Sequence, residues 1–406
     1  MYTDAMKYPI VKLKPAKEYP IKAGHPWIFS HAIESEPTVE SGELVNVISA
    51  NGEKLGIGMI NPMNSIRVRM ITRETDVDID SDFFAKRLKE LEKQKKPHLP
   101  PKTDGYRICH ADADGLPGLI VDKYADAIVF QIHTAGMEKL RDEAIEGIKK
   151  AFKPKILAER SDTDSRTQEN LKKTEPAVLT GKLDELVQFE ENGIPFYVDI
   201  LGGQKTGFFL DQRNTRMKVM ELSEGKKVLN LFGYTGAASV YAAKGGAETV
   251  TTVDISRPAL DLALKNFELN GFDPENPQFK FIEADVFDLF RDKALTDEYD
   301  LIICDPPAFA KSGQDVKRAL EAYSALNKRC LWMLKEGGIL ITSSCSGRVS
   351  EEDFRNMLKH ACGHTGRDAR VLDFFGQPFD HTEKLSFPEG RYLKTAVLEI
   401  VRAVTE

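Results

Sequence analysis

Short stretches of alternating apolar and polar residues mark the beginning of the chain. The runs ELVNVISA, KLGIGMI and SIRVRMIT have the period of two that is typical of strands, and Asn-Gly and Asn-Pro turns separate them. The next stretch, FFAKRLKELEKQKKPHLPP, is helical in character until its prolines end it. This pattern predicts a small β-rich domain, a barrel or a sandwich, over residues 8–75.

A different pattern follows over residues 76–190. The stretch LIVDKYADAIVFQIH predicts two strands around a short turn, and MEKLRDEAIEGIKKAF places apolar residues at helical spacing. We therefore expect a central α+β domain, which ends where the strand IPFYVDI leads into the last region.

Strands and helices alternate in the last region, residues 191–406. The stretches KKVLNLF, AETVTTVD, FKFIEAD, YDLIICDPP and GILITSSCS are typical of strands, and helical stretches separate them. One of these helices has clear ends, with Ser256 as its expected N-cap, Pro258 in its first turn and Gly271 as its stop. Repeated βα units of this kind predict an α/β fold with a doubly wound, mostly parallel sheet.

The composition is that of an ordinary globular protein, with 41% hydrophobic and 29% charged residues in 406. No apolar run approaches the roughly 20 residues of a membrane span, and the N-terminus lacks the apolar core of a secretion signal. We therefore expect a cytoplasmic protein without membrane contact. The formal net charge of −7 means that a nucleic-acid partner must be held by local patches. The five cysteines have neither CxxC pairs nor zinc-like spacing, so we expect free thiols and no metal.

Ligands of a doubly wound sheet bind at the carboxyl ends of its strands. The first strand ends in NLFGYTGAAS, where Gly233 and Gly236 permit a tight turn, but this is not the GxGxxG loop that cradles a pyrophosphate. Asp254 lies about 20 residues further on, where a carboxylate can accept both hydroxyls of a ribose. Asp285 and Asp305 end the next two strands. Each carboxylate alone is more often a cap, but together they indicate a nucleoside pocket without a phosphate cradle, which favours S-adenosylmethionine.

The segments NLFGYTGAAS, VDIS, EADVF and DPPAF resemble successive motifs of class I S-adenosylmethionine-dependent methyltransferases. Two more segments, KTGFFLDQRNTR and SSCSG, resemble those of the large-subunit ribosomal RNA cytosine carbon-5 methyltransferases that carry an N-terminal PUA domain. LKPAKEYPIKAGHPWIFSHAI is similar to the start of that PUA domain, and ADADGLPGLIVDKYADAIVFQ and ERSDTDSR are similar to the central domain. The resemblance implies a C-terminal Rossmann-like class I methyltransferase domain behind a β-rich PUA domain and a central α+β domain.

The resemblance also implies a set of residues that bind S-adenosyl-L-methionine. Asp254 would hold the ribose and Asp285 with Val286 the adenine. The plain alternatives are a surface ion pair for Arg213 and a core position for Phe209. The full set is Phe209, Asp211, Arg213, Asn230, Phe232, Tyr234, Thr235, Gly236, Asp254, Ser256, Asp285, Val286 and Asp305.

Cys345 is the catalytic nucleophile that the resemblance implies. Carbon 5 of cytosine is a weak nucleophile, and a thiolate that adds to carbon 6 moves electron density onto carbon 5, which then captures the methyl group. Asp305 would bond the base, the stiff loop at Pro306 would hold Asp305, and Phe309 would stack on the flipped base. The alternative for Cys345 is a buried structural thiol, which is how we interpret the thiols at positions 304, 330 and 362.

Two other functions remain open. The segment DPPAF also resembles the Asp-Pro-Pro-aromatic motif of enzymes that methylate exocyclic amines, so guanine N-methylation is the enzymatic alternative. A noncatalytic RNA-binding assembly factor is the alternative of another class. By resemblance, the first two domains would position large-subunit ribosomal RNA, and a homodimer paired through the PUA domain stays open. The candidate RNA contacts are Lys22, Trp27, Arg67 and Arg69.

Overall fold

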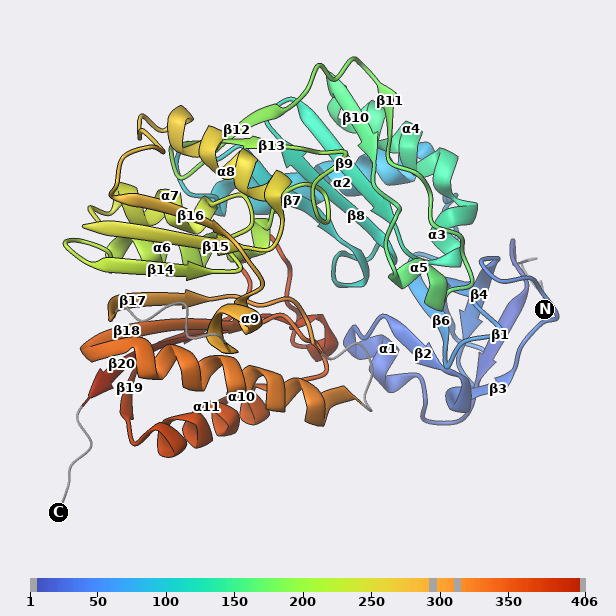
Figure 1. Ribbon diagram of the computed structural model, residues 1–406. Helices are drawn as coiled ribbons and strands as arrows, with labels where there is room; N and C mark the ends of the chain where they lie inside the picture. Colours follow the sequence, from blue (N-terminus) through green and yellow to red (C-terminus); the bar gives the residue numbers. More distant parts are fainter. Residues whose placement is uncertain (1–5, 292–297, 310–314, 402–406) are drawn as a thin grey trace. The chain divides into compact units, whose positions relative to one another are not determined.

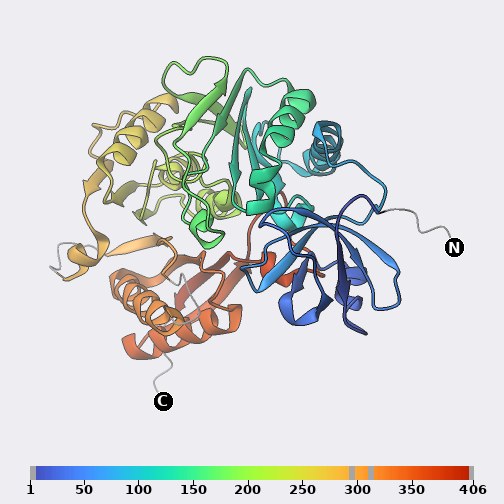
Figure 2. The ribbon, with the colours of Figure 1, turned by 90° about the vertical axis from the view of Figure 1, so that its right-hand side faces the viewer.

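The computed structural model describes residues 6–291, 298–309 and 315–401 (Figures 1 and 2). The chain forms two compact units and passes between them more than once. The boundary expected near residue 190 lies close to the first of these crossings. The first unit contains the chain up to Gly193 with Val198–Phe208 and Phe379–Gly390, and the second contains Ile194–Tyr197, Phe209–Pro378 and the chain from Arg391 onward.

The N-terminal part of the first unit is a sheet with the strand order β2-β6-β5-β4-β1-β3, drawn in blue in Figure 1. The three predicted strands are confirmed as β4, β5 and β6, and Gly52, at φ 84°, forms the turn between β4 and β5. Inward residues such as Val45 and Val68 form a core of their own. The elements are β1 (Ile10–Leu13), α1 (Tyr19–Ala23), β2 (Trp27–Phe29), β3 (Ile33–Ser35), β4 (Leu44–Ile48), β5 (Lys54–Ile60) and β6 (Ile66–Thr72).

A second sheet of the first unit has the order β11-β10-β9-β8-β7. Helices α2 and α4 pack closely, since a Cβ on Gly147 would lie 2.4 Å from the Cβ of Phe84. The single helix predicted over MEKLRDEAIEGIKKAF is interrupted at Leu140, whose ψ of 18° is not helical. The elements are α2 (Ser81–Lys95), β7 (Gly105–His110), β8 (Leu119–Tyr124), β9 (Ala127–Ile132), α3 (Ala135–Lys139), α4 (Arg141–Phe152), β10 (Ile156–Glu159), α5 (Ser165–Gln168), β11 (Ala177–Thr180) and β12 (Val187–Glu191).

The sheet of the second unit has the order β16-β15-β14-β17-β18-β20-β19. Strands β16 to β18 are parallel, which confirms the predicted doubly wound sheet, and β20 runs antiparallel between β18 and β19. The elements are β13 (Ile194–Val198), α6 (Arg213–Glu221), β14 (Lys227–Leu231), α7 (Ala237–Lys244), β15 (Thr249–Asp254), α8 (Arg257–Leu269), β16 (Phe279–Glu283), α9 (Val286–Arg291), β17 (Tyr299–Cys304), α10 (Val316–Met333), β18 (Leu334–Ser344), α11 (Glu351–Thr365), β19 (Asp368–Phe375) and β20 (Lys394–Val401).

The register of this sheet brings several strand ends to one edge. Leu231 at the end of β14 pairs with Cys304 at the end of β17, and Cys304 pairs with Thr342 of β18. The residues that follow β14, β15, β17 and β18 therefore leave the sheet on the same side. Among the described helices, none is both long enough and apolar enough to cross a membrane.

Candidate active site

The loop between β14 and α7 has a strained backbone. Phe232 and Tyr234 adopt φ values of 60° and 47°, which residues with a side chain rarely do. Gly233 and Gly236 leave no room for a side chain: a Cβ on Gly233 would lie 2.5 Å from a methyl group of Thr252, and one on Gly236 would lie 2.7 Å from Ala263. Strain that the surrounding structure holds in place is a feature of ligand sites.

Asp254, at the end of β15, ties this loop to the next helix. One of its carboxylate oxygens accepts a hydrogen bond from the backbone N–H of Tyr234 at 2.8 Å, and the other accepts from the backbone N–H of Ser256 at 2.9 Å. Ser256 is the N-cap of α8, as predicted, and its hydroxyl accepts from the N–H of Ala259 at 3.3 Å. Each oxygen of Asp254 keeps acceptor capacity for a ligand hydroxyl.

Two further residues predicted to bind the cofactor are buried. The side-chain amide of Asn230 donates to the hydroxyl of Ser239 at 2.9 Å, so this side chain braces β14 against α7. Thr235 is 2% exposed, and its hydroxyl has no hydrogen-bond partner among the described residues. A buried hydroxyl without a partner costs free energy, and a polar ligand at the strained loop would satisfy it.

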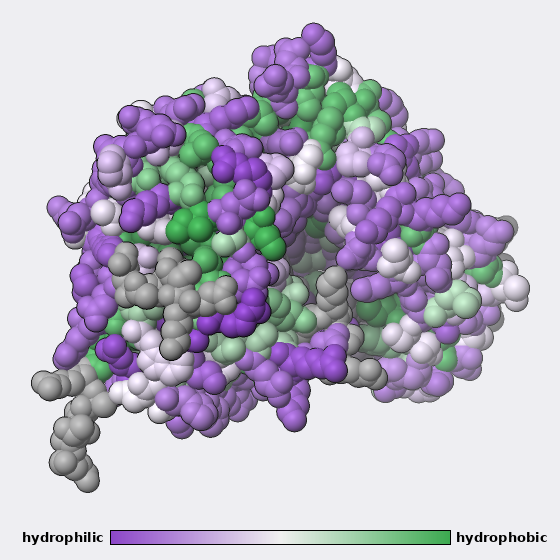
Figure 3. Space-filling view, in the orientation of Figure 1, coloured by the Kyte–Doolittle hydropathy of each residue, from purple (hydrophilic) through white to green (hydrophobic). Residues whose placement is uncertain are grey.

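The third strand, β16, is followed by Asp285 and Val286. Asp285 accepts from the backbone N–H of Phe287 at 2.7 Å and so begins α9, and Val286 is buried in the core. Ile255, which directly follows Asp254, is 66% exposed, and no motif in the sequence marks it. On the face shown in Figure 3, apolar surface interrupts the hydrophilic surface in the region of β16 and α8. An exposed apolar side chain beside a carboxylate suits the face of a purine ring.

Asp305 follows β17 and lies beside a residue that the sequence analysis did not single out. The side-chain amide of Gln212 donates to the carboxylate of Asp305 at 2.8 Å. Pro306 is buried, whereas Phe309 is partly buried with its ring centroid 4.8 Å from that of Tyr323. Phe309 thus has an aromatic partner inside the unit and packs against the core.

Cys345 follows β18, the neighbour of β17 in the sheet. Its side chain is partly buried, whereas Cys109, Cys304 and Cys330 are completely buried. The core positions predicted for Cys304 and Cys330 are confirmed, whereas Cys362 packs against the core from α11 but is only partly buried.

Residues far along the chain support the Cys345 loop. The hydroxyl of Tyr323 lies 3.0 Å from that of Ser346, and burial raises the pKa of Tyr323. The ammonium of Lys394 donates to the backbone carbonyls of Ser346 and Val349, both at 2.7 Å. Neither Tyr323 nor Lys394 stands out in the sequence, since only the pairing of β18 with β20 brings Lys394 here.

The segment before α6 also contributes to this edge. The rings of Phe209 and Tyr234 form an edge-to-face pair with centroids 5.2 Å apart. The hydroxyl of Tyr392 donates to the buried carboxylate of Asp211 at 2.7 Å. Arg213 is 1% exposed, so the alternative of a surface ion pair is wrong for this residue.

The four candidate RNA contacts lie in the first unit, and each has a partner there. Trp27 donates its indole N–H to Asp112 at 2.6 Å, and Arg69 bonds the same carboxylate at 2.8 Å. Arg67 forms an ion pair with Glu36 at 3.2 Å, and Lys22 forms one with Glu53. RNA contact by these side chains would therefore compete with bonds inside the protein.

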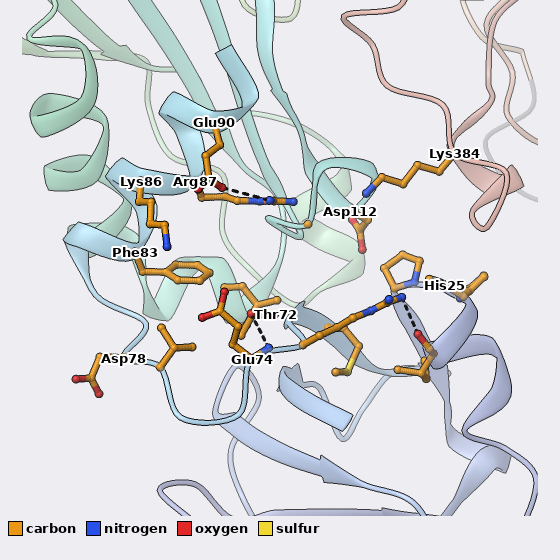
Figure 4. A pocket seen from close by; sticks show the side chains of 18 of the residues that line it. His25, Thr72, Glu74, Asp78, Phe83, Lys86, Arg87, Glu90, Asp112 and Lys384 are labelled. Carbon is orange, nitrogen blue, oxygen red and sulfur yellow. Dashed lines mark hydrogen bonds and ion pairs between the residues drawn. The ribbon is translucent and has the colours of Figure 1, made fainter. Parts of the chain in front are cut away.

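The first unit also contains a cavity of about 740 Å³, shown in Figure 4. Arg87 and Lys384 point from two sides toward the part of the cavity where Asp112 lies. Burial lowers the pKa of Lys384, and Arg87 and Arg73 contribute to this shift. Carboxylates such as Glu74 line the same cavity, so its charge is mixed. None of the residues predicted to bind the cofactor lines it.

The strand order of the second unit, its strained glycine loop and the acidic residues at successive strand ends define a class I S-adenosylmethionine-dependent methyltransferase. A family model described as S-adenosylmethionine-dependent methyltransferase matches residues 168–376, and a PUA-like domain model matches residues 11–73. S-Adenosylmethionine is therefore the cofactor.

Several named proteins are similar to nearly the whole chain. The ribosomal RNA large subunit methyltransferase I of Aeromonas salmonicida is 39% identical over 391 residues, 96% of this chain and 98% of that protein. The protein of the same name from Vibrio cholerae is 38% identical over 390 residues, 95% of this chain and 98% of that protein. The chain belongs to the ribosomal RNA large subunit methyltransferase I family.

Solved structures agree with this assignment. A protein from Streptococcus mutans described as a SAM-dependent methyltransferase has a TM-score of 0.82 and 26% identity, and the match covers 96% of this chain and all of that one. A methyltransferase named SMU.776, solved with SAH, also has a TM-score of 0.82 and 26% identity, and the match covers 96% of this chain and 99% of that one.

Proposed function

We propose that this protein transfers a methyl group to carbon 5 of a cytosine in large-subunit ribosomal RNA, through a covalent bond between Cys345 and the base. The observation that carries the proposal is the position of Cys345. It is a partly accessible thiol at the end of β18, and Asp305 ends the adjacent parallel strand. The ribosomal substrate rests on the names of the relatives.

The cofactor pocket is proposed at the ends of β14, β15 and β16. S-Adenosylmethionine supplies an electrophilic methyl group there. The unpartnered hydroxyl of Thr235, the strained loop at Tyr234 and the acceptor capacity of Asp254 fit the methionine and ribose parts of such a ligand. Asp285, Val286 and Ile255 would hold the adenine, and Phe209, Asp211 and Arg213 would close the pocket.

The chemistry then needs a thiolate and an oriented base. The Cys345 thiolate would add to carbon 6 of the cytosine, and the electron pair of the carbon 5–carbon 6 double bond would form the new bond from carbon 5 to the methyl carbon, while the pair of the broken methyl–sulfur bond stays with the sulfur of the donor. A base then removes the carbon-5 proton, the double bond re-forms, and the thiolate leaves. Asp305 would bond the ring nitrogen or the amine of the cytosine, and Gln212 keeps its carboxylate in place.

RNA recognition is assigned to the first unit and to Phe309. A target base must leave its stack before carbon 6 can be reached, and an aromatic ring such as Phe309 can stack on it. In the PUA-like domain, the surface that carries Lys22, Trp27, Arg67 and Arg69 would position the RNA by its shape. Because each of these four side chains has a partner inside the protein, each contributes less to RNA binding than the same side chain without a partner would.

The deciding experiment compares Cys345→Ala with Cys362→Ala. Both cysteines are partly accessible, which makes the second a matched control. With labelled S-adenosylmethionine and undermethylated ribosomal RNA, we expect Cys345→Ala to lose at least about a thousandfold in rate while cofactor affinity is kept. The label should be in 5-methylcytosine, and Cys362→Ala should behave as the wild type.

Two results would redirect the assignment. If Cys345→Ala keeps its rate, the enzyme needs no nucleophile, and methylation of an exocyclic amine by the Asp305 loop becomes the better description. If the wild type labels no ribosomal RNA at all while it binds the cofactor, the protein is an RNA-binding assembly factor.

A further inference from the structure

A buried cation lies next to the proposed nucleophile. Lys394, at the start of β20, is 3% exposed and pairs with Ser344 in the antiparallel register of β18 and β20. Cys345 is the next residue of the chain after Ser344. A lysine is rarely this buried unless something in the fold requires its charge.

Three backbone carbonyls surround the side-chain nitrogen of Lys394. Its ammonium donates to the carbonyls of Ser346 and Val349, both at 2.7 Å, and to that of Tyr392 at 2.9 Å. An ammonium has three N–H donors, whereas a neutral amine has two, so this arrangement of acceptors favours the protonated form. Because the carbonyls occupy all three N–H donors of Lys394, the lysine influences other neighbouring groups through its charge.

Among the charged groups around Lys394, Cys345 has the largest effect on the pKa of the lysine. Burial lowers the pKa of Lys394 to about 8, and the Cys345 thiolate opposes this shift more than Glu351 does, while Arg391 adds to it. Glu351 and Arg391 form an ion pair with each other at 3.0 Å. Tyr323, whose hydroxyl lies 3.0 Å from that of Ser346, stays neutral because burial raises its pKa. Arg348, a further cation of the loop, is exposed.

We propose that Lys394 is a positioning residue for Cys345: its ammonium holds the loop Ser346–Val349 and favours the thiolate over the thiol. This inference rests on the proposed function, which needs a thiolate at neutral pH. A cation next to a cysteine is a general way to obtain one. Because the ammonium is shielded from solvent, salt does not screen its effect as it would at the surface.

The test measures how fast iodoacetamide alkylates each cysteine as a function of pH, with each site read by mass spectrometry. In Lys394→Met the reactivity of Cys345 at pH 7 should fall about tenfold, because its titration should move up by about one unit. Lys394→Gln removes the charge but keeps two N–H donors for the carbonyls, and it should behave like Lys394→Met. Lys394→Arg should stay near the wild type.

Cys362 is the internal reference in every sample, and its profile should not change. An unchanged Cys345 profile in both neutral variants would overturn the inference. So would a profile that changes equally at Cys345 and Cys362, since that reports loosening of the unit. If Cys345→Ala keeps full methylation while the alkylation profiles shift as expected, the effect of Lys394 stands and the proposed function fails.

Discussion

The two halves of the ligand edge of the second unit are built in different ways. In the half proposed to bind the cofactor, the bonds that shape the site join residues close in sequence, 20 residues apart for Tyr234 and Asp254 and two apart for Asp254 and Ser256. In the half proposed to bind the substrate, the Gln212–Asp305 bond spans 93 residues. The segment before α6, which is proposed to close over the cofactor, is held by the Tyr392–Asp211 bond, which spans 181. Lys394 reaches Ser346 across 48 residues.

This difference shows which part of the site one βα unit can build. The βα unit that runs from β14 through the glycine loop to β15 brings Asp254 to this loop. It does not need contacts from the rest of the chain to do so. The loops after β17 and β18 depend on the antiparallel strand β20 and on the segment before α6. Local contacts form at little entropic cost, whereas long-range contacts require the whole sheet to be assembled.

The largest expected effect is on cofactor affinity, and it distinguishes the function of the proposed cofactor half from that of the proposed substrate half. Asp254→Ala should weaken S-adenosylmethionine binding at least about a hundredfold, because the loop and the ribose lose the same acceptor. Cys345→Ala should leave this affinity unchanged and remove methyl transfer. Calorimetric titration of both variants with the cofactor checks the separation, and equal losses of affinity would show that the halves are not independent.

A second prediction concerns pH and the buried cation of the substrate half. The folded pKa of Lys394, about 8, lies below its ordinary value of 10.5. Between these values the unfolded chain binds a proton that the folded chain has lost, so the lysine's contribution to stability becomes more favourable as pH rises. Relative to Lys394→Met, the free energy of unfolding of the wild type should increase by about 3 kcal/mol from pH 7 to pH 10.

Chemical denaturation of both proteins at several pH values measures this difference. The first unit is common to both proteins, so its own titration cancels. If the difference in the free energy of unfolding between the two proteins stays constant with pH, folding does not lower the pKa of Lys394.

A third prediction concerns the close packing of the cofactor half. Gly233→Ala would bring a methyl group within 2.5 Å of Thr252 and should cost about 2 kcal/mol of stability. Gly363→Ala is the control, since a Cβ there meets nothing within 4 Å and lies in helix α11. The control should be neutral or slightly stabilising. Thermal unfolding midpoints with and without cofactor give the comparison, and equal midpoints for the two variants would contradict it.

The smallest effect is expected from the longest connection. Tyr392→Phe removes one hydrogen bond to the buried Asp211 carboxylate, worth about 1.5 kcal/mol, so cofactor affinity should fall about tenfold. Tyr19→Phe, at a position 75% exposed in the first unit, should change nothing. An unchanged affinity in Tyr392→Phe would mean that Asp211 does not help to close the pocket.

Much of the fold could be predicted from the pattern of residues along the chain. The alternation of strands and helices from KKVLNLF onward predicts the parallel sheet, and the N-cap predicted at Ser256 is confirmed. The stretch around Cys362 is helix-like and forms α11, but no strand is predicted after it, because β19 and β20 form only as antiparallel neighbours in the sheet that contains β18. Cys362 is more exposed than expected, and the burial of Arg213 excludes the surface ion pair that was the alternative for this residue, since hydropathy does not say which face of a helix is covered.

By itself, the sequence determined the class of fold and the order of its motifs, because strand periodicity, helix caps and glycine turns are local properties of the backbone. It also placed Asp254 and Cys345 at strand ends, where ligands of parallel sheets bind. Only the tertiary structure decided which side chains, distant in sequence, support Asp254 and the Cys345 loop. Strand pairing and packing bring Gln212, Tyr392 and Lys394 to the site. The pattern of residues along the chain does not predict contacts between residues so far apart in sequence.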